Sequence, residues 1–250
     1  MSEPTLYLRL VPEDVAPLIL ISGDPARVQR TADLLDDARM IGVNREFAVA
    51  TGSHCGTPVT VVSGGIGAPS TAIALHELAL VGAKAVVRIG TMMGVEAQMG
   101  QVVLSTGAAR FEGTSPTYLP LAYPAIPDWP LVHALESAGR AADLDVRTGL
   151  TATFDAFYPH MAPELIGQGA LDVHDLKDAG VLSLDMETSL VFVLGQTLRL
   201  AAAAMCAVTV QAQPHLHLDP VVRADVDRRM VIAALDGLVA WEKAHAAVSR

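Results

Sequence analysis

The sequence predicts an α/β fold built on a mixed sheet, and two observations carry this prediction. Short apolar segments that are typical of buried strands alternate with segments of helical periodicity. Hydrophobic residues make up 51% of the 250-residue chain and aromatic residues only 4%. This balance suits aliphatic strands covered by helices better than a β-sandwich. Because no internal repeat or long linker interrupts the pattern, residues 1–250 are expected to form a single domain.

The predicted elements follow one another along the chain. The strands are the short apolar segments Leu18–Ser22, Val59–Ser63, Ala85–Ile89, Val102–Thr106, Val181–Leu184 and Ala203–Val210. The helices are the segments Ala26–Leu35, Ser70–Val81, Leu131–Ala142 and Thr188–Leu198. Apolar residues at helical spacing predict that Pro220–Ala247 closes the domain as an amphipathic helix capped by Asp219. The proline-rich segment Pro116–Pro130 predicts a long surface loop.

The charge of the chain restricts its partners. The formal net charge is −10, and lysine and arginine residues are nowhere clustered. Binding to a nucleic-acid backbone needs several clustered cations, so no nucleic-acid partner is expected. An anion bound by this chain must be small and held by a few placed arginines.

The chain is expected to be cytoplasmic and to have no membrane partner. Its longest apolar run, Leu200–Val208, is far shorter than the roughly 20 residues that a membrane-spanning helix needs. The first residues lack the basic and apolar regions of a signal peptide. The two cysteines, Cys55 and Cys206, do not form a disulfide framework, which is consistent with a reducing compartment.

Two strand ends carry residues suited to an anion. Gly23 directly follows the first strand, and Arg27 lies in the first turn of the next helix, whose N-terminus offers free N–H groups. Arg88 lies in an apolar strand with Thr91 shortly after it. A buried arginine needs an anionic partner, which is either a bound anion or an internal carboxylate. Because α/β sheets bind ligands at the carboxyl ends of their strands, these residues together predict a phosphate-sized anion.

A glycine cluster follows the strand Val59–Ser63, with the sequence Gly-Gly-Ile-Gly-Ala-Pro-Ser at residues 64–70. This cluster could be a third anion-binding loop or a dinucleotide-binding loop. A dinucleotide-binding loop needs an acidic residue at the end of the next strand, but that strand ends in Arg-Ile-Gly-Thr. No nicotinamide cofactor is therefore expected.

Two further segments predict a site for a sugar and a flat ring. The sequence Asp-Met-Glu at residues 185–187 places a carboxylate where ribose hydroxyls could donate to it, although acidic residues are also common at a helix N-terminus. The loop at residues 154–159 offers Phe157 as a ring that could stack on a base, although such loop aromatics often serve packing alone.

Six motifs in this order carry a resemblance to a known family: GDPARV, NREF, GGIGAPST, RIGT, FYP and DMET. Together they resemble the nucleoside phosphorylase superfamily of the trimeric or hexameric type, and most closely its uridine phosphorylase branch. The resemblance extends from about Tyr7 to the C-terminus. It implies a mixed sheet that forms a distorted barrel surrounded by helices, and dimers arranged as hexamers. It also implies cleavage of a nucleoside by inorganic phosphate, with no organic cofactor.

The resemblance also implies roles for individual residues. The phosphate ligands would be Gly23, Arg27, Arg88 and Thr91, together with Arg45 lent by a neighbouring subunit. The ribose would contact Met186, Glu187 and Tyr7, and the base would contact Phe157, Met161 and Gln211. A monovalent cation, usually potassium, would lie between subunits at Glu46, Ile66 and Ser70.

The half of the site that would hold the base departs from the family pattern. Met161 and Pro163 occupy the positions of a glutamine and an arginine that read uracil, and Ala212 occupies that of a supporting arginine. Val210 stands where the purine enzymes of the superfamily have an acidic residue. Tyr7 replaces a histidine that caps the ribose. New base contacts could come from the polar residues Gln211, Gln213, His160 and His215. The departures predict relaxed or altered base selectivity.

Other functions are alternatives to phosphorolysis. A nucleosidase that uses water would not need the arginines at 27, 45 and 88, whereas a nucleoside-binding protein with little catalysis would explain the altered base contacts. The sequence His215-x-His217-x-Asp219 gives a metal hydrolase hypothesis, but no further ligand is evident and Asp219 doubles as a helix cap. No G-x-S-x-G motif supports a serine hydrolase.

Overall fold

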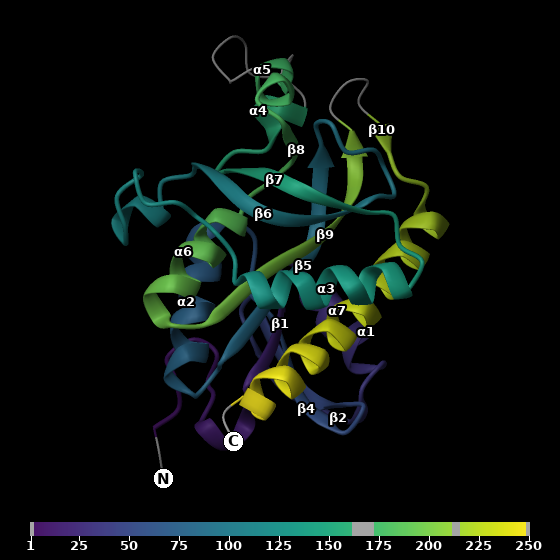
Figure 1. Cartoon of the computed structure of the whole chain (residues 1–250). Coiled ribbons are helices and arrows are strands. Elements are labelled where there is room, and N and C mark those ends of the chain that lie inside the picture. Colours follow the sequence, from purple (N-terminus) through teal and green to yellow (C-terminus); the bar gives the residue numbers. More distant parts are fainter. Residues whose placement is uncertain (1–2, 162–172, 212–215, 249–250) are drawn as a thin grey trace.

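The computed structural model describes residues 3–161, 173–211 and 216–248, and Figure 1 shows the arrangement of their elements. One sheet contains every strand assigned within these ranges. The strands are β1 (Leu18–Ser22), β2 (Asp36–Asn44), β3 (Phe47–His54), β4 (Thr57–Ser63), β5 (Ala85–Gly94), β6 (Val102–Phe111), β7 (Val146–Phe154), β8 (Val181–Asp185), β9 (Ala201–Gln211) and β10 (Leu216–His217).

Part of this sheet closes on itself. The strand order is β10-β9-β6-β7-β8-β5-β1-β4-β3-β2, and β5 also pairs with β9. The strands β5, β8, β7, β6 and β9 therefore form a barrel, from which β1, β4, β3 and β2 continue as an open sheet. Parallel and antiparallel pairs are both present, since β1 is parallel to β4 and β5 whereas β8 is antiparallel to β5. The predicted mixed sheet with a distorted barrel is confirmed.

Helices cover both faces of the sheet (Figure 1). The helices are α1 (Pro25–Ala32), α2 (Ala68–Leu80), α3 (Trp129–Ala141), α4 (Tyr158–Met161), α5 (Val173–Asp178), α6 (Thr188–Leu198) and α7 (Pro220–Val248), with short 3-10 turns η1 (Pro12–Asp14) and η2 (Ser115–Thr117). One buried cluster joins α1, α3 and α7 to one face, and a second joins α2 and α6 to the other. In the described part of the chain, no helix has the length and apolar character of a membrane span.

Most predicted elements are present, and α1, α2 and α3 begin within two residues of their predicted starts. Asp219 caps α7 by accepting a hydrogen bond from Val221 N at 2.9 Å. The segment between η2 and α3 is a loop, as predicted, apart from a β-bridge between Ala108 and Ala125.

The sequence analysis does not predict four strands, β2, β3, β7 and the two-residue β10, and burial explains the three longer ones. Strand β2 is exposed along almost all of its length, so its sequence lacks the apolar run of a buried strand. Strand β3 is buried along half of its length and β7 along a third, and both contain several small or polar residues. Strand β5 extends five residues beyond its predicted end at Ile89, because Met92 and Met93 are also buried between β8 and β9.

Candidate active site

Three parallel strands bring two glycine loops together. Ser22 lies beside Ser63 in the pairing of β1 with β4, and Ile21 lies beside Arg88 in the pairing of β1 with β5. The loops that leave β1 and β4 are close enough that a Cβ built on Gly23 would lie 3.3 Å from the carbonyl oxygen of Gly65. The two loops therefore lie side by side at this edge of the sheet, which is where α/β sheets bind ligands.

Arg88 is buried and lies beside two carboxylates. Its Nε donates to Asp185 Oδ2 at 2.9 Å, and its Nη2 contacts the same oxygen at 2.8 Å and Glu187 Oε2 at 2.5 Å. Burial opposes the charge of Arg88, but Glu187 and Asp185 outweigh it and raise the pKa of the guanidinium above its ordinary value. Arg88 is therefore a fixed cation that already has anionic partners. Because β5 is longer than predicted, Arg88 and Thr91 lie within the strand rather than at and beyond its end.

A glycine makes room for this guanidinium. A Cβ on Gly90 would lie 2.4 Å from Nη1 of Arg88, so any larger residue would displace the arginine head. Gly90 thus has a steric role in the site, which explains the glycine in the Arg-Ile-Gly-Thr motif.

Glu187 connects Arg88 to the N-terminus of α2. Its Oε1 accepts a hydrogen bond of 2.6 Å from the backbone N–H of Gly67, which is the N-cap of α2. Burial raises the pKa of the Glu187 carboxyl, and Asp185 adds to the rise, against the opposing attraction of Arg88. One arginine therefore serves two buried carboxylates, Asp185 and Glu187.

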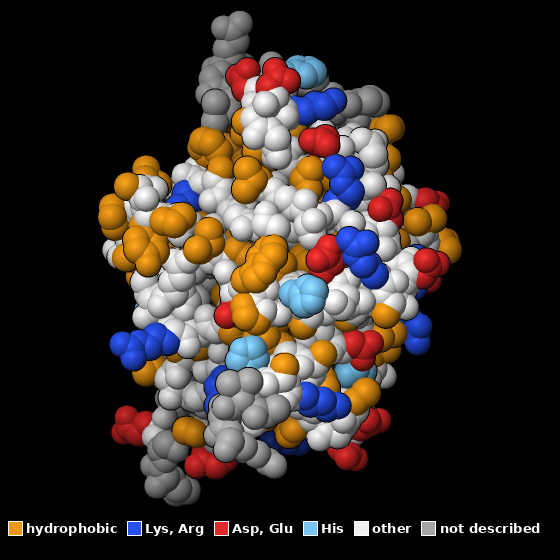
Figure 2. Space-filling view, in the orientation of Figure 1, with side chains coloured by type: hydrophobic (Ala, Val, Ile, Leu, Met, Phe, Trp, Pro, Cys, Tyr) orange, Lys and Arg blue, Asp and Glu red, His pale blue; other side chains and the backbone are white. Residues whose placement is uncertain are grey.

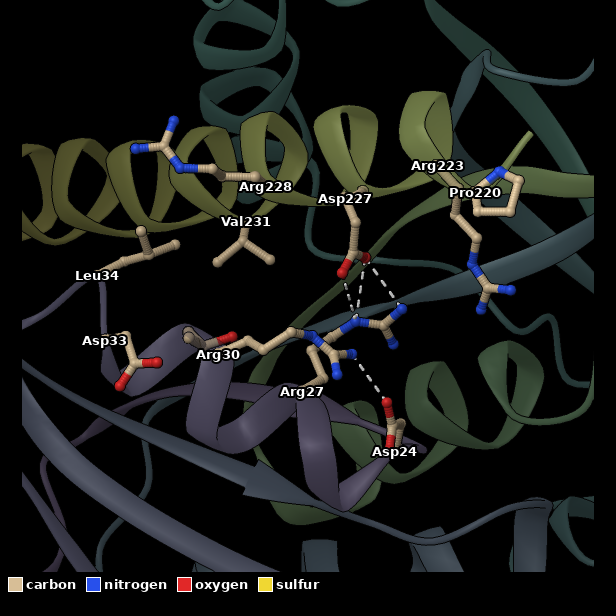
Figure 3. Close-up of a pocket in the computed structure, with 12 residues that line it drawn as sticks. Asp24, Arg27, Arg30, Asp33, Leu34, Pro220, Arg223, Asp227, Arg228 and Val231 are labelled. Carbon is tan, nitrogen blue, oxygen red and sulfur yellow. Dashed lines mark hydrogen bonds and ion pairs between the residues drawn. The ribbon is translucent and has the colours of Figure 1, made fainter. Parts of the chain in front are cut away.

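Arg27 makes a separate ion pair beside a pocket of about 620 Å³. Its Nη2 lies 3.0 Å from Asp227 Oδ1, on the facing helix α7. Figure 3 shows this pair between α1 and α7, together with the ion pair of Arg30 with Asp24. The pocket lining includes four arginines and three aspartates, but Arg88, Thr91 and Glu187 do not belong to it. The pocket therefore adjoins the candidate site through Arg27 and does not enclose it.

Arg45 contacts Tyr7. The guanidinium carbon of Arg45 lies 5.5 Å from the centre of the Tyr7 ring, and Arg45 itself has a positive φ of 56° in the turn between β2 and β3. Tyr7 is held in turn by Glu77, whose carboxylate accepts its backbone N–H at 2.9 Å. Beside Arg45, Glu46 Oε1 accepts a hydrogen bond of 3.1 Å from Ser70. The side chain of Ile66 is 76% exposed.

The residues predicted to hold a base lie in apolar surroundings. Phe157 and Met161 are half-buried and pack against a small cluster that includes Met93, Leu176 and Leu184. Gln211 ends β9 beside Gly94, and a Cβ on that glycine would lie 3.1 Å from the Gln211 side-chain oxygen. Met186 is half-buried between Asp185 and Glu187. The structure thus separates a charged half of the site, around Arg88, from an apolar half, around Phe157 and Met161.

A model of the phosphorylase superfamily matches residues 17–236, which is most of the chain. The chain belongs to the phosphorylase superfamily. Its curated relatives include a guanosine phosphorylase from Halorubrum lacusprofundi, 40% identical over 197 residues and 78% of each chain. They also include a uridine phosphorylase from Thermococcus kodakarensis, 36% identical over 81% of this chain and 76% of the relative.

Solved structures of phosphorylases share this fold. A uridine phosphorylase from Vibrio fischeri ES114 superposes with a TM-score of 0.87 at 29% identity, over 96% of this chain and 98% of that one. A purine nucleoside phosphorylase from Toxoplasma gondii, in complex with immucillin-H, gives a TM-score of 0.84 at 27% identity over 95% and 96% of the two chains. The assignment to the nucleoside phosphorylases that the six motifs predicted is confirmed.

Two carboxylates of the candidate site, Asp185 and Asp227, have no role of their own in the sequence analysis. Asp185 binds Arg88 and also accepts hydrogen bonds from Thr153 Oγ1 at 2.9 Å and Thr188 Oγ1 at 2.6 Å. An aspartate that ends a buried strand, three residues before a threonine, is the signal for this anchoring role. Asp227, which binds Arg27, gives no such signal because 200 residues separate the two in sequence.

Four residues of the sequence interpretation, Pro163, Ala212, Gln213 and His215, lie outside the described residues. His217 is in β10, and both it and Asp219 are exposed.

Proposed function

We propose that this chain cleaves nucleosides with inorganic phosphate, and that Gly23, Arg27, Arg88 and Thr91 bind the phosphate while Glu187 binds the ribose. The activity of the family supports the reaction, which yields a free base and a (deoxy)ribose 1-phosphate and makes the chain a pentosyltransferase. The observation that carries the residue assignment is the buried triad of Arg88, Asp185 and Glu187 beside the two glycine loops.

The geometry suits each step of phosphorolysis. Asp185 fixes Arg88 through Nε, so the guanidinium is oriented before phosphate arrives and no reorganisation is needed during the reaction. A phosphate held by Arg88, Arg27 and the N–H of Gly23 approaches the anomeric carbon as a positioned nucleophile. Glu187 accepts hydrogen bonds from the ribose hydroxyls and stabilises the positive charge that develops on the sugar. As the glycosidic bond breaks, its electron pair leaves with the base.

The decisive experiment is a panel of nucleosides assayed with and without phosphate. We expect ribose 1-phosphate to form only when phosphate is present. Release of free ribose without phosphate would indicate a nucleosidase, and binding of nucleosides without turnover would indicate a binding protein. Either outcome would contradict the proposal.

The apolar half of the site supports altered base selectivity. Phe157 and Met161 offer a ring and a thioether to a base, and neither side chain donates a strong hydrogen bond to a pyrimidine carbonyl. A site without such donors loses the discrimination that paired polar groups provide. The names of the relatives include both a guanosine and a uridine phosphorylase, so the fold itself accommodates both kinds of base. Of the polar residues predicted as new base contacts, Gln211 and His160 belong to the described part of the chain.

Exposed apolar side chains support a homo-oligomer, which we propose is a hexamer built from dimers. Figure 2 shows hydrophobic side chains gathered at the left of the view, over the loop that precedes α3. The exposed large apolar residues of this segment are Phe111, Leu121, Tyr123, Ile126 and Trp129. A patch of this kind on a protein marks an interaction surface. In the single chain Arg45 contacts Tyr7 instead of the phosphate residues, which agrees with its service to a neighbouring subunit.

We also propose that a monovalent cation binds near Glu46, between two subunits. A carboxylate oxygen of Glu46 and the hydroxyl of Ser70 are adjacent, and hard oxygen ligands of this type suit potassium. Glu46, Ile66 and Ser70 from each of two chains would hold the ion, and its positive charge would attract the Glu46 carboxylates of both chains.

We also propose a cytoplasmic location. Both cysteines of the chain are free, which supports a reducing compartment.

A further inference from the structure

We infer that His54, Cys55 and Asp236 form a binding site for a zinc-like divalent cation, away from the candidate active site. One ligand atom from each of these residues lies within 4.8 Å of the other two. They come from two separate elements, since His54 and Cys55 are at the tip of the β3–β4 hairpin and Asp236 is in α7. The site would therefore connect residues that are about 180 positions apart in sequence.

The chemistry of the three ligands selects the ion. An imidazole nitrogen, a thiolate and a carboxylate oxygen are the donors that Zn²⁺ takes in proteins, whereas Mg²⁺ and Ca²⁺ prefer oxygen ligands alone. Three protein ligands leave a fourth position for water in tetrahedral geometry. Zinc–ligand distances of about 2.0–2.3 Å place neighbouring ligand atoms about 3.4 Å apart. Small rotations of these side chains reach that spacing.

The surroundings of the cluster permit this adjustment. His54 Nε2 and Asp236 Oδ1 are 2.6 Å apart, so the ion would replace the hydrogen that they now share. Cys55 is exposed, and the Asp236 side chain is 48% exposed. Two of the three ligands are therefore open to an ion from solvent, while the His54 side chain is 15% exposed.

The turn itself does not account for a cysteine. His54 pairs with Thr57, so the hairpin loop consists of two residues, Cys55 and Gly56, with φ values of 49° and 73°. Two successive positive φ values are typical of a type I′ turn, which favours asparagine, aspartate or glycine at its first position. Cysteine is a poor residue for this backbone conformation. An ion pair of His54 with Asp236 explains two members of the cluster, and metal binding explains all three.

The site would act as a staple between the hairpin and α7. Without the ion, the two elements are joined here by one His–Asp contact. A bound ion would add a coordinate bond from each ligand, and it would stabilise the folded chain by an amount that grows with the logarithm of the free ion concentration once that exceeds Kd. The same helix carries Asp227, the partner of Arg27, nine residues earlier, so the staple holds the helix that borders the pocket.

The test uses the full chain, freed of metal with a chelator and kept reduced. We expect one Zn²⁺ per chain to bind with micromolar or tighter affinity by calorimetry and to raise the melting temperature. Co²⁺ at the same site should give a sulfur-to-cobalt charge-transfer band, which reports the thiolate directly. Zinc binding that needs millimolar concentrations and lacks this band with cobalt would overturn the inference.

Variants assign the ligands. Cys55→Asn should abolish the cobalt band and weaken zinc binding tenfold or more, and asparagine suits the turn so well that misfolding would not explain the loss. Asp236→Asn should weaken zinc binding similarly. His133→Ala, at an exposed histidine of α3, is the matched control and should leave both readouts unchanged. Unaltered zinc affinity in Cys55→Asn would overturn the inference.

Discussion

The two halves of the candidate site are held together by different forces. Around Arg88 every position is fixed by charge, because Asp185, Glu187 and the N–H of Gly67 form one buried network. Around Phe157 and Met161 the side chains are half-buried and held by apolar packing. Directional bonds in a buried network tolerate little change, whereas apolar packing accepts side chains of similar volume. We therefore expect the charged half to determine the reaction and the apolar half to diverge when the base changes.

The largest expected effect comes from changing Arg88. Arg88→Ala should lower phosphorolysis by about 10²–10³, as expected for the loss of one preorganised charged group. It should also destabilise the fold by about 3–5 kcal/mol, since two buried carboxylates lose their partner. Arg88→Lys keeps the charge and should be more stable than Arg88→Ala, although it loses the hydrogen bond from Nε to Asp185.

In the apolar half, the variant Met161→Leu should keep most of the activity of the natural chain.

Steady-state kinetics and chemical denaturation measure both quantities, and Arg140→Ala, in an exposed ion pair of α3, is the matched control. Equal losses in the Arg88 and Met161 variants would contradict the division into two halves.

The second largest effect is expected from Arg45, which we propose completes the charged half of the site in a neighbouring subunit. Arg45→Ala and Arg88→Ala chains should each be nearly inactive, whereas co-expression of the two should restore activity. A mixed dimer contains one site with both arginines, so random pairing restores about a quarter of the sites. The activity of separately purified and unmixed variants is the baseline. A fully active monomer in sizing experiments would show that Arg45 acts within its own chain or is not needed.

The third effect belongs to the apolar half. We expect kcat/KM values for uridine, thymidine, inosine and adenosine to differ by less than about a thousandfold, which is roughly 4 kcal/mol of transition-state binding. Gln211→Ala should change the ranking of these bases if this side chain reads them. A larger preference for uridine would show that backbone groups or ordered water read uracil as well as side chains do.

The two halves also differ in how far the sequence could predict them. The sequence predicts that Arg88 is a buried arginine that needs an anion, and an internal carboxylate and a bound ligand are the alternatives. The structure shows the carboxylates Asp185 and Glu187, and the proposed phosphorolysis adds the ligand. The partner of Arg27 could not be predicted, because Asp227 is distant in sequence and lies on an amphipathic helix among other charged residues. The surroundings of Met161 depend on packing among β7, β8 and α5, which no local pattern reveals.

A smaller effect should follow from freeing Arg27. Asp227→Asn removes the charge that holds this guanidinium at 3.0 Å, so Arg27 becomes less well oriented for phosphate. We expect the KM for phosphate to rise severalfold with little change in kcat, because the arginine itself remains. Asp225→Asn, in an exposed ion pair with Arg229, is the control. A fall in kcat as large as that of Arg88→Ala would contradict this expectation and show that the pair of Arg27 and Asp227 contributes as much to the reaction as Arg88 does.

The smallest effect concerns the stability of the resting enzyme. The folded state raises the pKa of Glu187, so this carboxyl contributes stability below its unfolded pKa and loses it as the pH rises through the folded value. Glu187→Gln should therefore gain stability relative to the natural chain as the pH increases from about 4.5 to neutrality. Denaturation midpoints at several pH values measure this. A difference that is constant with pH would show that Glu187 has an ordinary pKa.

The pairing of β5 with β9 has a consequence for how the enzyme folds during its synthesis. It joins residue 85 to residue 201, so the barrel closes only after four fifths of the chain is available. Contacts of such long sequence separation form slowly, because the intervening chain must be ordered first. On the ribosome, Arg88 is made long before Asp185 and Glu187, and it stays solvated until they arrive. The Arg88 cation therefore becomes buried late, together with the carboxylates that make its burial tolerable.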